Sequence, residues 1–167
     1  MTINILDIVP GTSVDGPGLR TAVYMAGCSH RCPGCHNPDS WDRSAGRAMT
    51  IDEIVRIAAE NGFPVTLTGG DPLHNPDAVI AIADALNPLD LGDIWLYTGF
   101  TWEQIAAGKK LMDAVVKVDV VVDGPFIEAK RDLSLHFRGS ANQRIILVGP
   151  SLGQGRIVEW QPPTFDF

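Results

Sequence analysis

The sequence is short of cysteine and lacks the features that mark exported or membrane proteins. It has only 3 cysteines in 167 residues, so a framework of disulfide bonds is not expected. No lysine or arginine precedes Arg20, and no stretch approaches the ~20 consecutive apolar residues that a membrane span requires. We therefore expect a cytoplasmic protein that has no membrane partner.

Basic residues are also scarce relative to acidic ones. The 13 lysines and arginines face 20 aspartates and glutamates, which gives a net charge of −7. This charge repels a nucleic-acid backbone, so we expect a protein or small-molecule partner and no nucleic acid. The length fits one globular domain that spans residues 1–167.

Helix and strand signals alternate along the chain. Helices are predicted after a capping box at 50–53, after Asn75-Pro76, and after a second capping box at 101–104. Buried strands are predicted at residues 19–25, 65–68, 94–98, 115–122 and 145–148.

This alternation predicts an α/β fold with a parallel sheet. A closed barrel of eight units needs ~250 residues, so we expect a partial (open) parallel β/α barrel of about five or six strands. A doubly wound sheet is the alternative. In both folds the functional groups gather at the carboxyl ends of the strands.

The three cysteines form one motif directly after the first predicted strand. Cys28, Cys32 and Cys35 have the spacing C-x3-C-x2-C. Three thiolates from one short loop can ligate three irons of a [4Fe-4S] cluster. The fourth iron then has no protein ligand and is open to a small molecule, as a catalytic zinc keeps one position open.

Other interpretations of this loop stay open. Residues 32–36 match the haem-attachment pattern C-x-x-C-H, and Cys32 with Cys35 matches a thioredoxin-type redox pair, but both leave Cys28 unexplained. The strongest alternative is a closed structural zinc site in which His30 or His36 is the fourth ligand.

The cysteine spacing resembles the signature of the radical S-adenosylmethionine (SAM) superfamily. Residues 69–72, Gly-Gly-Asp-Pro, are similar to the Gly-Gly-Glu-Pro motif of that superfamily, which approaches the methionine part of SAM. The resemblance implies a close backbone approach at Gly70 and a carboxylate at Asp71 that pairs with the ammonium group of SAM. Asp is one methylene shorter than the commoner Glu, and a lone Gly-Gly-Asp is often only a turn.

Further segments resemble the activating enzymes of glycyl radical proteins, and most closely those of anaerobic (class III) ribonucleotide reductase. Together they span residues 14 to 144. The segments are 14–20 (VDGPGLR), 35–38 (CHNP), Trp41, 95–101 (WLYTGFT), 118–126 (VDVVVDGPF) and 137–144 (FRGSANQR).

The resemblance implies a partial barrel of the radical SAM type, a [4Fe-4S] cluster on the three cysteines, and SAM bound to the open iron. One electron then cleaves the sulfonium to methionine and a 5′-deoxyadenosyl radical, which takes a hydrogen atom from a glycine of the reductase large subunit. A cytosolic electron donor is the second implied partner, and no catalytic side chain is expected beyond the cluster and SAM. The implied cofactor-binding residues are Gly34, Cys35, His36, Gly70, Asp71 and Asp123.

Several side chains have a plainer interpretation. Asp123 is equally a turn residue before Gly124. Arg20 and Arg31 are expected at the solvated surface rather than beside the cluster, and His74 and His136 are expected to be structural or solvated. Residues 138–144 form either an exposed loop or a docking segment for the partner.

Three alternative functions remain. They are activation of a different glycyl radical enzyme, a reaction like that of 7-carboxy-7-deazaguanine synthase, and a structural zinc or Fe–S module without enzymatic activity.

Overall fold

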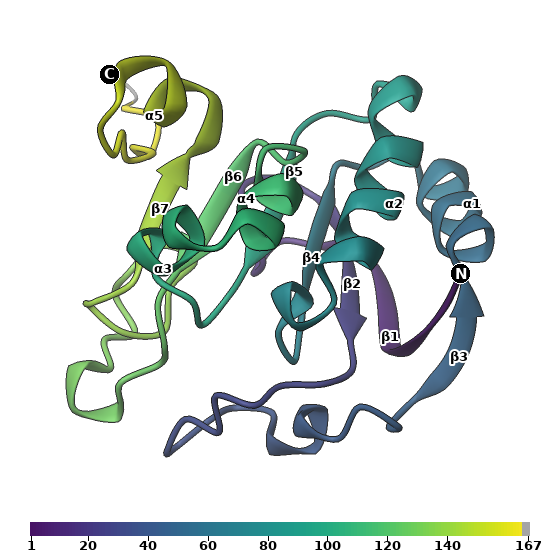
Figure 1. Ribbon diagram of the computed structural model, residues 1–167, viewed down its shortest axis with the longest axis horizontal. Helices are drawn as coiled ribbons and strands as arrows, with labels where there is room; N and C mark the ends of the chain where they lie inside the picture. Colours follow the sequence, from purple (N-terminus) through teal and green to yellow (C-terminus); the bar gives the residue numbers. More distant parts are fainter. Residues whose placement is uncertain (165–167) are drawn as a thin grey trace.

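The computed structural model describes residues 1–164 of the chain and has one seven-stranded sheet at its centre (Figure 1). The last three residues of the domain predicted over 1–167 lie outside the described residues. The strand order in the sheet is β3-β1-β2-β4-β5-β6-β7. The strands are β1 (Thr2–Thr12), β2 (Arg20–Met25), β3 (Arg47–Thr50), β4 (Val65–Gly69), β5 (Ile94–Tyr97), β6 (Val120–Asp123) and β7 (Arg144–Leu147).

The sheet is an open barrel with a parallel centre and antiparallel edges. Strands β2, β4, β5 and β6 pair in parallel, whereas β1 pairs antiparallel with β2 and β3, and β7 pairs antiparallel with β6. The predicted partial barrel is therefore confirmed, but it has seven strands rather than about five or six. The strands that the sequence did not indicate, β1 and β3, both lie at one edge.

The helices α1 to α4 lie along one face of the sheet in Figure 1. The capping boxes predicted at Thr50 and Thr101 both form. The strand predicted over 115–122 begins only at Val120, because α4 extends to Val115 and buries that valine in the core. The helices are α1 (Ile51–Asn61), α2 (Pro76–Leu86), α3 (Trp102–Ala107), α4 (Lys109–Val115) and α5 (Val148–Gln154), with 3-10 turns η1 (Pro38–Trp41), η2 (Pro72–His74), η3 (Asn87–Leu89) and η4 (Glu128–Lys130).

Apolar side chains are buried on both faces of the parallel strands. The main core packs α1, α2 and α4 against the sheet, and a smaller cluster around Trp95 fills part of the opposite face. Burial on both sides explains why the central strands are almost continuous runs of apolar residues. The four parallel strands end at the same edge of the sheet, so the loops that follow them lie close together.

The helices of residues 1–164 are at most 11 residues long, and none of them could cross a bilayer.

Candidate cofactor site

A cavity of about 310 Å³ lies at the carboxyl ends of the parallel strands. Each of the four strands contributes the loop that follows it, which is where a parallel β/α fold places its functional groups. The cavity is lined by the predicted residues Cys28, Cys32, Cys35, His36, Gly70 and Asp71, among others.

The cysteine loop follows β2 and folds back against η1. The amide of Gly27 donates to the carbonyl of Ser40 at 2.8 Å, and the amide of Cys28 donates to the carbonyl of Trp41 at 3.2 Å. Inside the loop, the amide of Cys35 donates to the carbonyl of Cys32 at 3.1 Å. These bonds hold three free, partly buried thiols around one cavity.

The three thiols do not lie as close together as ligands of one zinc ion do. A tetrahedral zinc ion with Zn–S bonds of about 2.3 Å holds its sulfurs about 3.8 Å apart. Among residues 1–164, the three cysteine sulfurs do not gather within 4.8 Å of one another, either alone or with His36. A cubane cluster binds each thiolate through a different iron and so needs wider spacing. Burial raises the pKa of the Cys28 thiol, which must lose its proton when it ligates a metal.

Gly69, the last residue of β4, and Gly70 both lie where another part of the backbone passes too close to leave room for a side chain. Gly69 has φ +106°, and a Cβ there would lie 2.4 Å from the nitrogen of Met25. A Cβ on Gly70 would lie 2.5 Å from the carbonyl oxygen of Gly27, and the next amide, of Asp71, donates to that oxygen at 2.8 Å. The Gly-Gly-Asp segment is thus joined to the start of the cysteine loop.

The Asp71 carboxylate is almost fully buried, with 2% of the residue exposed, and it joins three loops. Its Oδ1 accepts from the amide of Leu73 at 2.9 Å. Its Oδ2 accepts from the hydroxyl of Thr98 and the amide of Gly99, both at 2.9 Å, and lies 2.6 Å from Nε2 of His30. The loops after β2, β4 and β5 therefore meet at one negatively charged group.

The chain is similar to proteins of known families over most of its length. The family model described as a 4Fe-4S single cluster domain matches residues 14–146. Anaerobic ribonucleoside-triphosphate reductase-activating proteins match most of the chain. The protein of Salmonella typhi is 34% identical over 143 residues, which are 80% of this chain and 92% of that protein. The protein of Escherichia coli K12 is 33% identical over 150 residues, which are 84% and 96% of the two chains. The protein of phage T4 is 33% identical over 145 residues, or 83% and 90%.

The chain belongs to the anaerobic ribonucleoside-triphosphate reductase-activating protein family. The fold agrees with this assignment. The crystal structure of QueE from Escherichia coli superposes with a TM-score of 0.51 at 16% identity, over 60% of this chain and 54% of that chain. The likeness to QueE is one of fold.

The other residues that the sequence singled out in this family member lie in different positions relative to the cavity. His36 lines it and packs on Phe126, with ring centroids 5.0 Å apart. Gly34 adopts φ +76°, and a Cβ there would lie 2.9 Å from the carboxyl carbon of Glu128. Asp123 precedes Gly124, which lines the cavity, but its own carboxylate accepts from the amide of Trp102 at 2.7 Å and pairs with Arg144 at 2.6 Å.

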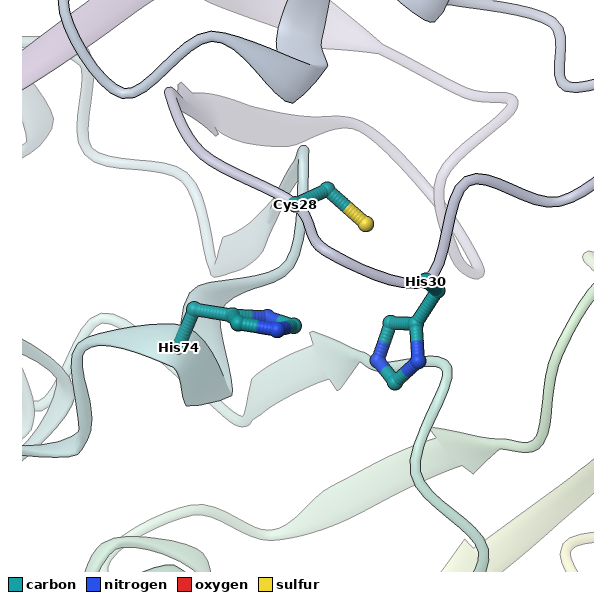
Figure 2. Close-up of side chains that lie close together, drawn as sticks. All are labelled: Cys28, His30 and His74. Atoms are coloured by element: carbon teal, nitrogen blue, oxygen red, sulfur yellow. The ribbon is translucent and has the colours of Figure 1, made fainter.

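One expectation about a charged side chain was wrong. Arg20 is not a solvated surface residue: it is 1% exposed, pairs with Asp93 at 2.8 Å and donates to the hydroxyl of Thr66. His74, which the sequence predicts to be structural or solvated, lies beside Cys28 and His30, as Figure 2 shows. The sequence does not reveal the Arg20 contacts because Thr66 and Asp93 lie 46 and 73 residues away along the chain.

The segment 137–144 is an internally bonded loop beside the cavity. The side-chain oxygen of Gln143 accepts from the amide of Gly139 at 2.8 Å, and its nitrogen donates to the carbonyl of Gly124 at 3.1 Å. Asn142 donates to the carbonyl of Pro125 at 2.7 Å. This loop therefore braces the wall of the cavity at residues 124–126.

Two further lining residues were not singled out from the sequence. The hydroxyl of Tyr24 donates to Asp15 at 2.8 Å, and both residues line the cavity. Burial, followed by the contact with Asp15, raises the pKa of Tyr24, so this phenol stays protonated. In the sequence, the one indication that these two residues belong to the site was that Asp15 lies in the 14–20 segment.

Proposed function

We propose that this chain is a radical SAM enzyme that cleaves SAM reductively on a [4Fe-4S] cluster and generates a glycyl radical on an anaerobic ribonucleotide reductase. One observation carries the proposal. The three free cysteines of one loop meet the Gly-Gly-Asp segment in a single cavity, within a chain 33–34% identical to activating proteins of that reductase.

In this proposal, the residues of the chain bind the cluster and SAM and orient them in the cavity. When bound, the cluster supplies the electron for cleavage of the sulfonium. Cys28, Cys32 and Cys35 are the proposed ligands of the cluster. The buried carboxylate of Asp71 offers a negative charge to an ammonium group in the same cavity, where a charged pair is stronger than in water.

The remaining predicted residues are proposed to shape the cavity around the cysteines and Asp71. Gly70 lets the strand end approach closely, and Gly34 and His36 are proposed on the side that receives the adenosine. Asp123 enters the proposal as a positioning residue: its bonds to Arg144 and Trp102 fix the strand end that continues into Gly124 on the cavity wall.

We further propose one radical SAM domain over residues 1–167, with the reductase large subunit and a cytosolic electron donor as partners in the cytoplasm. The net charge of −7 supports a protein partner and disfavours nucleic acid or an anionic membrane surface.

Anaerobic reconstitution with iron and sulfide tests the proposal. We expect an oxygen-sensitive [4Fe-4S] spectrum, release of methionine and 5′-deoxyadenosine after reduction with SAM present, and a glycyl doublet in the electron paramagnetic resonance spectrum once an anaerobic ribonucleotide reductase is added. A zinc-free chain that forms no [4Fe-4S] cluster and cleaves no SAM would overturn the proposal.

Single substitutions of Cys28, Cys32 or Cys35 by Ala should each abolish SAM cleavage. Ser44→Ala is the matched control, since Ser44 is an exposed loop residue whose hydroxyl bonds Asp42. A cysteine variant that holds an intact cluster and cleaves SAM would contradict the ligand assignment.

A further inference from the structure

Cys28, His30 and His74 form a second group of metal-binding side chains. One ligand atom from each lies within 4.8 Å of the other two. The group combines two segments: Cys28 and His30 belong to the cysteine loop after β2, and His74 ends η2 after β4. In Figure 2 the thiol and the two rings face a common space between these segments.

An unpartnered nitrogen points to a ligand at this group. The Nδ1 atom of His74 is buried and makes no hydrogen bond to the described residues, although it lies 3.8 Å from Oδ2 of Asp71, and only 11% of the His74 side chain is exposed. Its Nε2 atom contacts the hydroxyl of Ser29. A buried polar atom without a partner costs about 1–3 kcal/mol, a cost that a bound ion at this group removes if the ring turns toward it.

An aromatic side chain packs against both imidazoles. The two ring centroids are 4.9 Å apart, and Phe100 lies 4.7 Å from the ring of His30 and 5.4 Å from that of His74. An apolar wall of this kind limits the access of water, as the surroundings of metal sites do.

We propose that, when the [4Fe-4S] cluster is absent, Cys28, His30 and His74 bind one zinc ion, with water as the fourth ligand. A thiolate and two imidazoles are donors that zinc prefers, and tetrahedral binding sets S and N ligands about 3.5 Å apart. The observed separations of up to 4.8 Å close to that value by side-chain rotation.

The zinc ion and the cluster exclude each other, because both use the Cys28 thiolate. This exclusion rests on the proposed function, whereas zinc binding itself does not. Divalent zinc binds nitrogen and sulfur ligands more tightly than ferrous iron does. Zinc at this group therefore blocks iron loading until it is removed.

Cobalt titration of the cluster-free, full-length chain under anaerobic conditions tests the site. We expect the visible absorption bands of tetrahedral Co²⁺ and a charge-transfer band with the intensity of one cobalt–thiolate bond. Both should disappear when Zn²⁺ displaces the Co²⁺ ion. Cys32→Ala and Cys35→Ala should keep these bands, although they remove proposed cluster ligands. His74→Ala should weaken binding at least about tenfold, as loss of even supporting residues does at metal sites.

The matched control is His36→Ala, which removes a histidine of the same loop outside the group and should keep the affinity. Bands with the intensity of three thiolates that disappear in Cys32→Ala would show the closed three-cysteine site instead and overturn the proposal. X-ray absorption of the zinc-loaded wild-type chain needs no variant. We expect one sulfur and two imidazole nitrogens, and three sulfurs would contradict the site.

Reconstitution in the presence of one equivalent of zinc tests the exclusion. Cluster formation should fall in the wild-type chain, and the loss relative to the zinc-free sample should be relieved in His74→Ala. Equal inhibition of both chains would contradict the proposed exclusion. If no chain forms a cluster without zinc, the proposed function fails, and the cobalt titration still decides the zinc site.

Discussion

The Nε2 atom of His30 lies 2.6 Å from Oδ2 of Asp71 and thereby joins the cysteine loop to the end of β4. The contact connects the motif that carries the thiols with the motif that is proposed to hold the methionine part of SAM. A Cβ on Gly99 would lie 2.5 Å from the imidazole, so the absence of a side chain at Gly99 admits the His30 ring. Three loops that are distant in sequence thus depend on one carboxylate.

Asp71→Asn should destabilise the chain and weaken SAM binding. The amide cannot accept from Leu73, Thr98 and Gly99 together, because its nitrogen turns a donor toward donors. We expect the free energy of unfolding to fall by about 1–3 kcal/mol, measured by urea denaturation of the cluster-free chain.

The control for this substitution is Asp77→Asn on the exposed side of α2, where the carboxylate lies 3.9 Å from Lys110. It should change stability by less than about 0.5 kcal/mol. Equal effects of the two substitutions would contradict the role assigned to Asp71.

Gly99→Ala should displace His30 from Asp71. Overpacking of this kind costs about 1–3 kcal/mol. In a double-mutant cycle, much of that cost should vanish when His30 is also Ala, with a coupling energy of about 0.5–3 kcal/mol by urea denaturation. Additive effects of the two substitutions would show that His30 is not what the new methyl group meets.

Gly153→Ala is the control for the added methyl group. A Cβ there meets nothing within 4 Å, and the residue lies in helix α5. This substitution should stabilise the chain by about 0.5–1 kcal/mol, because alanine loses less backbone entropy than glycine in a helix.

Asp93→Ala should cost more than the loss of a surface ion pair. It removes the partner of buried Arg20 and the acceptor of the Trp95 indole, both at 2.8 Å. We expect a loss of about 2–3 kcal/mol, since Asp93 is itself 41% exposed and water replaces part of the contact. Asp84→Ala removes an exposed pair with Lys117 and should cost at most about 1 kcal/mol by thermal or urea unfolding.

Glu103 should contribute stability that is lost in acid. Its hydrogen bonds from Arg144 lower the pKa of the carboxyl from 4.5 to about 2 in the folded chain. A lowered pKa favours the folded state above pH 4.5, and this contribution disappears as the pH falls from about 4.5 to about 2. Because the Glu103 side chain is 64% exposed, Glu103→Gln should cost only about 0.2–1 kcal/mol at pH 7.

Urea unfolding of both chains from pH 7 to pH 2 measures this contribution. The difference between wild type and Glu103→Gln should shrink toward zero at the acid end. A difference that stays constant with pH would contradict the ion pair with Arg144 as its source.

The sequence by itself determined the features that depend on near neighbours. The capping boxes at Thr50 and Thr101 use residues three positions apart, and the cysteine spacing places three thiols in one loop whatever the rest of the chain does. The order of helices and strands likewise follows from local periodicity, and it indicated the parallel centre of the sheet and the edge where the cavity lies.

Only the tertiary structure decided which distant groups meet. The sequence did not indicate strand β1, whose pairing with β2 is interrupted by two register irregularities. His30 meets Asp71 across 41 residues, and Arg20 meets Asp93 across 73. The physical reason is that a buried charge must find a partner wherever the strand order brings one, and strand order is set by packing of the whole sheet rather than by any local pattern.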